Sequence, residues 1–226
     1  MTVEQIVGLL AEEYGPIRWR PHRDPLSELV MTILSQNTSD ANSRRAFDRL
    51  VARFGDWEAV AAADVEDTAD AIKLGGLAQV KAPRIKSILQ RIREERGSLD
   101  LRFLEDMPVE EAKSWLRRLP GVGPKTAACV MLFGLGRPVF PVDTHVYRVS
   151  RRLGLVDSGV SVEGAHEVLG RLFPAEHVYQ SHMHLIQHGR KVCRAQHPRC
   201  QKCVLLQVCP AGQFLLGTAL ADKVRA

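Results

Sequence analysis

A short stretch from Leu119 to Ala127, with the sequence LPGVGPKTA, constrains the fold of this chain more than any other part. Gly121 and Gly123 predict a tight turn, because glycine adopts backbone angles that other residues avoid. Pro124 suits the first position of a new helix, where its missing N–H costs nothing. Lys125 then falls in the first turn of that helix, beside backbone N–H groups that have no helical partner. The stretch therefore predicts two helices joined by a glycine hairpin that can approach a phosphate closely.

The lysine of this hairpin has two possible roles. Helix-hairpin-helix elements occur in DNA-binding proteins without any chemistry of their own, where backbone amides hold phosphate oxygens without reading sequence. Lys125 could be one more phosphate contact, or it could act as a nucleophile. On the hairpin alone, the phosphate contact is the favoured interpretation.

Apolar residues follow helical spacing along almost the whole chain, and no strand-length alternation stands out, so we expect an all-α fold. The segments 3–10 and 26–34 show the pattern most clearly, and Asp24-Pro25 before the second segment resembles an N-cap followed by a first-turn proline. The second segment should bury five apolar residues: Leu26, Leu29, Val30, Ile33 and Leu34. A connector rich in glycine and proline, at 136–141, is a candidate domain boundary. No apolar run approaches the roughly 20 residues needed to cross a bilayer. The amphipathic, acidic start argues against a targeting peptide, so we expect an intracellular protein without a membrane partner.

The charge of the chain is moderately basic, with a formal net charge of +5. Its distribution is uneven: residues 54–72 contain six acidic and no basic side chains, whereas residues 81–96 contain six basic and two acidic ones. Further basic groups lie at 137–152 and 190–202. Basic surface on one side suits a polyanion such as nucleic acid, although solvated helix faces would give the same pattern.

Four of the five cysteines, Cys193, Cys200, Cys203 and Cys209, fall close together in the pattern C-x6-C-x2-C-x5-C. Four thiolates in one short loop match the ligand number of a tetrahedral zinc ion or an iron–sulfur cluster. Only one pair has the C-x2-C spacing that zinc sites often repeat, which mildly favours a cluster. Cys129 is interpreted as a core residue.

Two further groups of polar residues each have a structural and a functional interpretation. Asp143, in the sequence VDTH, can cap a helix, which is a common role for aspartate; His145 can be an ordinary helix residue. The histidines at 182, 184 and 188 are interpreted as packing or phosphate contacts, because four cysteines nearby already suffice for a metal.

Together, LPGVGPKTA with its lysine, VDTH eighteen residues beyond that lysine and the cysteine pattern resemble endonuclease III, a helix-hairpin-helix DNA glycosylase of base excision repair. The resemblance covers roughly residues 20–210. It implies two helical domains that flank a DNA-binding cleft: a six-helix barrel with the hairpin at 22–136, and a cluster domain built from 1–21 and 137–226.

The resemblance also implies roles for individual residues. Lys125 matches the catalytic lysine and Asp143 the catalytic aspartate, and the four cysteines match the ligands of a [4Fe–4S] cluster. Gln36 matches the residue that fills the gap left by an extruded base, and Leu77 matches a wedge in the opposite strand. The remaining DNA contacts are expected at Gly121, Val122, Gly123, Thr126 and His145.

The implied function is removal of oxidised pyrimidines from duplex DNA by a glycosylase that is also an abasic-site lyase, acting as a monomer in the cytoplasm at the nucleoid. A mismatch-directed glycosylase is the nearest alternative, but the mismatch adenine enzymes lack the lysine. A non-enzymatic DNA-binding module with a structural metal is the other alternative. Such a module would not need both Lys125 and Asp143 in these places.

Overall fold

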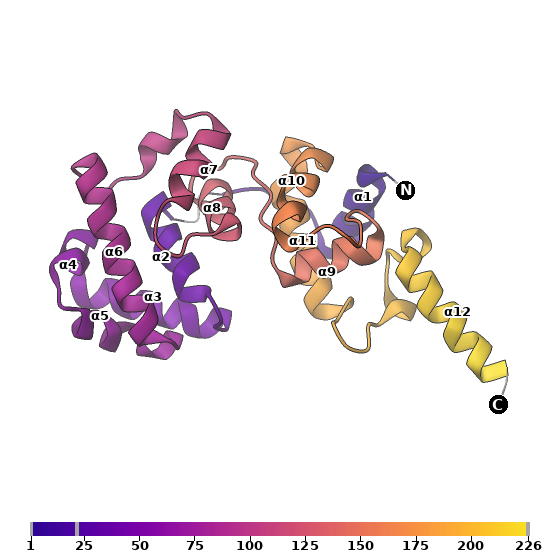
Figure 1. Ribbon diagram of the computed structural model, residues 1–226. Coiled ribbons are helices and arrows are strands. Elements are labelled where there is room, and N and C mark those ends of the chain that lie inside the picture. Colours follow the sequence, from indigo (N-terminus) through magenta and orange to yellow (C-terminus); the bar gives the residue numbers. More distant parts are fainter. Residues whose placement is uncertain (1, 21–22, 225–226) are drawn as a thin grey trace. The chain divides into compact units, whose positions relative to one another are not determined.

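The computed structural model describes residues 2–20 and 23–224, with side chains described up to residue 217, and within these ranges the fold is helical without a strand (Figure 1). The all-α prediction is therefore confirmed. No helix in the described part of the chain is long and apolar enough to cross a membrane.

The chain divides into two compact units, one formed by Arg20–Arg137 and the other by Met1–Trp19 together with Pro138–Ala226. The first of the two boundaries expected from the sequence, between residues 21 and 22, lies outside the described residues. The second unit is discontinuous, so its two segments must be tied together by contacts between the chain ends.

The unit 20–137 is built around helix α2, Pro25–Ser35. Asp24 caps this helix, as predicted, by accepting hydrogen bonds from the backbone N–H groups of Leu26 and Ser27. All five apolar residues expected on its buried face are at most 1% exposed. The helices that follow in this unit are α3 (Asp40–Phe54), α4 (Trp57–Ala62), α5 (Val65–Ile72), α6 (Ala78–Arg96), α7 (Val109–Arg117) and α8 (Pro124–Cys129).

Helix α8 continues into a π-helical turn, Val130–Gly134, that packs against α2. A Cβ atom on Gly134 would lie 2.9 Å from the Cα atom of Pro25, so only glycine allows this close approach. Helix α2 also contacts α3, α6 and α8 (Figure 1). The hairpin that α8 carries is therefore anchored directly on the central helix of its unit.

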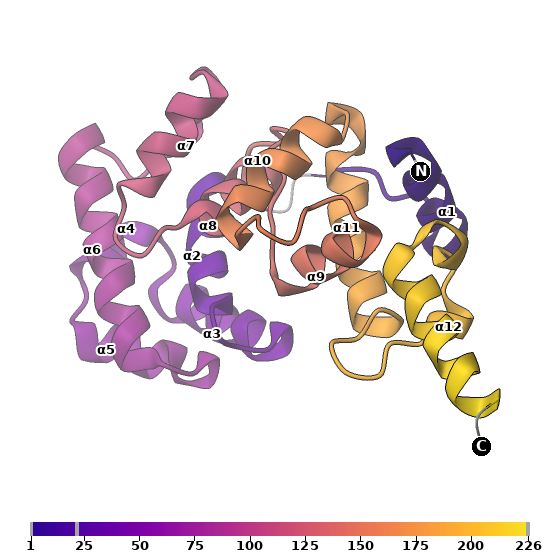
Figure 2. The same ribbon diagram turned by 45° about the vertical axis from the view of Figure 1, so that its right-hand side comes forward.

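The other unit contains α1 (Val3–Tyr14), α9 (Thr144–Leu153), α10 (Val162–Leu172), α11 (Val178–Lys191) and α12 (Pro210–Val224). Helix α11 packs against both α1 and α9, and α12 packs against α9 (Figure 2). The backbone N–H of Ile17 donates to Gln180 Oε1 at 2.9 Å, and His184 Nε2 lies 2.9 Å from the Gly15 carbonyl oxygen. These contacts join the N-terminal segment to the C-terminal one.

The histidines of α11 are core residues, which confirms their interpretation as packing groups. His182 and His184 are 2% exposed or less, and His182 Nδ1 lies 2.9 Å from the Pro141 carbonyl oxygen. Cys129 is also buried, as expected. Helix α12, which follows the last cysteine, was not expected from the sequence.

Candidate functional site

The glycine hairpin has the predicted form. Helix α7 ends at Arg117, and a turn closed by the Val122 N–H and the Leu119 carbonyl oxygen leads to Gly123, the N-cap of α8. Gly121 has a φ of 71°, in the left-handed region that favours glycine, and a Cβ atom there would also displace the Arg84 side chain, which would lie 2.5 Å away. No side chain caps α8, which leaves its first amides available to a ligand.

Lys125 is half-buried at the second position of α8, and the next residue, Thr126, is buried. Thr126 Oγ1 accepts a hydrogen bond from Gln36 Nε2 at 3.3 Å, and the same nitrogen lies 3.4 Å from the Gly121 carbonyl oxygen. Arg84 Nη1 donates to the other end of the amide, Gln36 Oε1, at 3.0 Å. The structure therefore brings three predicted site residues, Gln36, Gly121 and Thr126, into one hydrogen-bonded group.

Leu77 lies at the start of α6 and is 54% exposed. Its φ of 52° is in the left-handed region, which is costly for a residue with a branched side chain. At this exposure Leu77 gains little free energy from burial, so the strained turn must be held by the residues around it.

Glu28 on α2 is a titratable group that sequence reasoning missed. It is only 7% exposed, and its Oε1 accepts a hydrogen bond from the Thr32 hydroxyl at 3.4 Å. Its Oε2 has no hydrogen-bond partner, and the nearest cation is Arg23, at 3.6 Å. Burial raises the pKa of Glu28 to about 7, against the opposing influence of the Arg23 and Lys125 charges. A carboxyl group that titrates near neutrality therefore belongs to the electrostatic environment of Lys125.

Replacing Glu28 with glutamine should change how stability depends on pH. The folded state holds the Glu28 proton more tightly than the unfolded state, where the ordinary pKa is 4.5. Wild-type stability therefore falls as pH rises from about 4.5 to about 7, by about 3 kcal/mol from this group. Glu28→Gln removes the titration. In denaturant unfolding, the free energy of unfolding of the variant should therefore rise relative to that of the wild type between pH 4.5 and pH 8. A difference that stays constant with pH would contradict the assignment.

Asp143 and His145 lie at the start of α9, in the other unit. Asp143 is half-buried and is the N-cap of the helix: its Oδ1 accepts a hydrogen bond from the Val146 N–H at 2.7 Å. His145 Nδ1 lies 3.1 Å from Arg148 Nη2. The capping interpretation of Asp143 is therefore correct, and a catalytic role would be additional to it.

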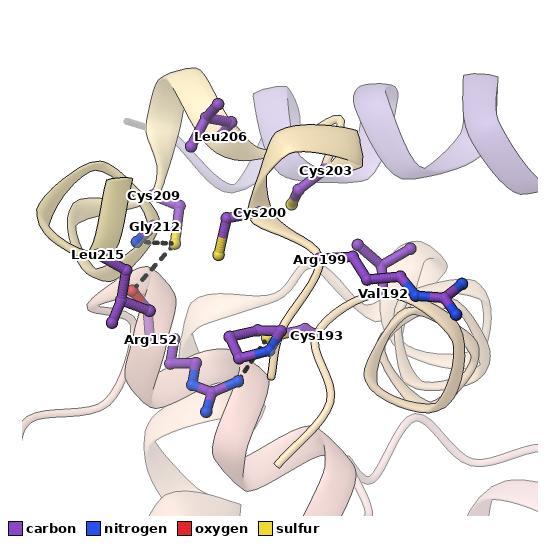
Figure 3. A pocket seen from close by; sticks show the side chains of 11 residues that line it. Arg152, Val192, Cys193, Arg199, Cys200, Cys203, Leu206, Cys209, Gly212 and Leu215 are labelled. Atoms are coloured by element: carbon purple, nitrogen blue, oxygen red, sulfur yellow. Dashed lines mark hydrogen bonds between the residues drawn. The ribbon is translucent and has the colours of Figure 1, made fainter. Parts of the chain in front are cut away.

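The four clustered cysteines line one cavity, together with Arg152 and the apolar side chains of Leu206 and Leu215 (Figure 3). All five cysteines of the chain are free thiols. No group of three or more His, Cys, Asp or Glu side chains within the described residues could hold a single metal ion. The four thiols of the cysteine pattern surround one shared cavity.

Several donors face these sulfur atoms. Arg152 Nη1 donates to Cys193 Sγ at 3.3 Å, and the Gly212 N–H donates to Cys209 Sγ at 3.3 Å (Figure 3). Burial raises the pKa of the Cys203 thiol to about 11. Soft sulfur ligands surrounded by N–H donors match the surroundings of iron–sulfur clusters in proteins.

A third sulfur contact comes from His188, through a chain of hydrogen bonds that sequence reasoning missed. Tyr14 Oη lies 2.9 Å from His188 Nδ1, and His188 Nε2 lies 3.4 Å from Cys203 Sγ. Burial lowers the pKa of His188 to about 4, so its ring is neutral at pH 7. When the Tyr14 hydroxyl donates to Nδ1, the ring proton must be on Nε2, where it faces the sulfur. Helix α1 is thereby connected to the cysteine loop.

The sequence of this chain is similar to those of known DNA repair proteins. Residues 30–175 match the family described as HhH-GPD superfamily base excision DNA repair protein. A protein of Arabidopsis thaliana named as a DNA glycosylase is 43% identical over 168 residues, which cover 74% of this chain and 57% of that protein. Endonuclease III of Thermotoga maritima is 36% identical over 186 residues, covering 82% of this chain and 83% of that protein.

Solved structures give a similarity of the same kind. The structure of a non-covalent endonuclease III–DNA complex matches with a TM-score of 0.79 and 30% sequence identity, covering 96% of this chain and 99% of that chain. A trapped covalent intermediate of endonuclease III with DNA matches with the same values. The similarity therefore extends over both units.

Proposed function

Because this chain belongs to the HhH-GPD superfamily of base excision DNA repair proteins, we propose that it is a bifunctional DNA glycosylase and abasic-site lyase that removes oxidised pyrimidines from duplex DNA. The observation that carries this proposal is the placement of Lys125 at the second position of the hairpin helix. The endonuclease III relatives support it, since one of them has been trapped as a covalent intermediate with DNA.

In the proposed mechanism, Lys125 is the nucleophile. The lone pair of its neutral Nζ attacks the anomeric carbon of the sugar, and the bond to the base breaks with its electron pair leaving on the base. The sugar ring opens to give a Schiff base between Nζ and the anomeric carbon. Loss of a proton from the adjacent sugar carbon then breaks the bond to the 3′ oxygen, which nicks the strand. Hydrolysis of the Schiff base restores the lysine.

Asp143 supplies the second function of the mechanism. As a carboxylate it either takes up the proton that Lys125 loses or stabilises positive charge that develops on the sugar. Its hydrogen bond to the Val146 N–H fixes the position of one carboxylate oxygen and leaves the other for this chemistry.

The other predicted residues act on the DNA. A target base must leave the stack before Lys125 can reach its sugar, at a cost of a few kcal/mol. Gln36 and Leu77 offset part of this cost by filling the vacated space. The amides of residues 121–123, together with Thr126 and His145, hold the backbone of the strand.

We infer that Cys193, Cys200, Cys203 and Cys209 hold a [4Fe–4S] cluster. A [4Fe–4S] cluster takes four thiolate ligands, which suits four thiols that line one cavity. Such a cluster would hold the basic loop at 190–202 in one conformation on the DNA-binding surface. The Arg152 side chain supports this loop by donating to the carbonyl oxygens of Arg194 and Ala195.

Purified protein should show a broad visible absorption band from this cluster, whereas a zinc site would be colourless. Replacing Cys203 with serine should abolish most of the band and lower the bound iron, because a soft ligand is lost from the cavity. The matched control is Cys129→Ser, which changes a buried cysteine outside the cavity and should leave the band intact. Wild-type protein that contains zinc and no band would contradict the cluster.

The function is tested on short duplexes that contain one oxidised pyrimidine, such as thymine glycol. We expect release of the damaged base and strand cleavage without alkali, with undamaged duplexes left intact. Cleavage only at mismatches would favour a mismatch-directed glycosylase. Binding of every duplex without base release would favour a DNA-binding module.

We propose that the protein acts as a monomer at the nucleoid. Sedimentation with and without DNA tests whether it is a monomer.

A further inference from the structure

Two loops of the unit 20–137 carry the residues proposed to fill the vacated stack. Gln36 follows α2, and Leu77 precedes α6. Each loop contains a residue other than glycine in the left-handed region: Asn37, next to Gln36, has a φ of 52°, and so does Leu77. Such backbone strain persists only where the surrounding structure holds it.

Lys81 joins these two loops. Its side chain, on the first turns of α6, is 2% exposed, and its three N–H donors have three oxygen acceptors. Lys81 Nζ donates to the Leu34 carbonyl oxygen at 2.7 Å, to Thr38 Oγ1 at 2.9 Å and to the Gly75 carbonyl oxygen at 2.9 Å. The Thr38 hydroxyl also donates to the Gly75 carbonyl. One ammonium group thus fixes the end of α2, the loop after it and the turn before Leu77.

Burying an ammonium group has a large desolvation cost, so it is a poor way to stabilise a core. Its three acceptors are neutral oxygens, and no ion pair involves Lys81 among the described residues. Burial accordingly lowers the pKa of this lysine below its ordinary value. Well-packed apolar side chains often stabilise a core as much as a buried charge does or more. A methionine in place of Lys81 would fill a similar volume. It has no N–H group, however, and could not hold three carbonyl and hydroxyl oxygens of two strained loops at fixed positions.

We propose that Lys81 is a positioning residue for base extrusion, which holds the Gln36 loop and the Leu77 turn in the arrangement that fills the vacated stack. The inference rests on the proposed function. Loops that are already ordered lose little conformational entropy when they bind the opened duplex. Without Lys81, the turns at Asn37 and Leu77 relax toward ordinary backbone angles. The side chains of Gln36 and Leu77 then no longer enter the vacated stack together.

The test compares Lys81→Met with the wild type in single-turnover base release from two duplexes. In one duplex the damaged base is paired, and in the other it lies in an unpaired bubble, where extrusion is already accomplished. We expect base release from the paired duplex to fall by about 10- to 100-fold, and release from the bubble to fall by much less. An equal loss on both duplexes, or no loss, would overturn the proposal.

Lys86→Met is the matched control, because Lys86 is on the same helix and its Nζ also donates to backbone carbonyls, those of Ala61 and Ala63. It should leave the ratio between the two duplexes unchanged. If Lys81→Met does not fold, Thr38→Val replaces it, since this change removes one acceptor of Lys81 and keeps the side-chain shape; its defect should also be confined to the paired duplex. A wild type that releases no base from either duplex would instead contradict the proposed function.

Discussion

Replacing Lys125 with glutamine is expected to abolish strand cleavage and to slow base release by about 10⁴- to 10⁶-fold, the range seen when an enzyme loses one member of its catalytic group. Glutamine keeps much of the side-chain length but cannot form a Schiff base. DNA binding should change little, because the hairpin amides remain and only one of several positive charges is lost. Single-turnover kinetics on a duplex with thymine glycol, together with a binding titration, separates the two effects.

Lys113→Gln is the matched control for this variant. Lys113 lies on α7, the other helix of the hairpin element, where it forms an ion pair with Glu110 at 2.9 Å. The control removes the same charge from the same unit and should leave both activities intact. If Lys125→Gln merely weakened binding while cleaving at the wild-type rate when saturated, Lys125 would be a phosphate contact and the nucleophile would have to be found elsewhere.

Replacing Asp143 with asparagine should slow base release by about 10²- to 10⁴-fold, the contribution expected of a positioned acid–base or electrostatic group. Asparagine is as good an N-cap as aspartate, so α9 should keep its stability and the protein its affinity for DNA. The substitution therefore separates the capping role from the proposed chemical one. Thermal unfolding and the base-release rate are the two measurements.

A second N-cap aspartate provides the comparison. Asp56 caps α4 by accepting a hydrogen bond from the Ala59 N–H at 2.7 Å, the same contact over the same spacing as at Asp143. Asp56→Asn should be as stable as Asp143→Asn. It should release the damaged base at the wild-type rate. Equal activity of the two variants would reduce Asp143 to a cap.

The elements that the sequence predicted well are those fixed by local chemistry. The cap at Asp24, the proline start of α8 and the turn at Gly121 each depend on backbone angles or hydrogen bonds within a few residues. The similarity to endonuclease III, expected from the hairpin, the aspartate and the cysteine spacing, is confirmed by the sequence and structural matches. The roles of individual site residues remain predictions.

What the sequence could not reveal depends on long-range packing. Glu28 is read from the sequence as one more polar residue of a helix, and only its burial makes its carboxyl group unusual. Lys81 belongs to a basic segment that was expected at the surface, either solvated or facing a polyanion, yet its side chain is in the core. The hydrogen-bonded chain from Tyr14 to Cys203 joins residues at the two ends of the sequence. No local spacing signals such contacts.

The central claim is that Lys125 forms a covalent bond with the sugar of damaged DNA. The most direct test is borohydride reduction of wild-type protein mixed with a duplex that contains an abasic site, because reduction converts a Schiff base into a stable link. The mechanism predicts a protein–DNA adduct that survives denaturation, with the link mapped by peptide mass to Lys125 and absent from Lys125→Gln. Wild-type protein that binds this duplex but gives no adduct would contradict it.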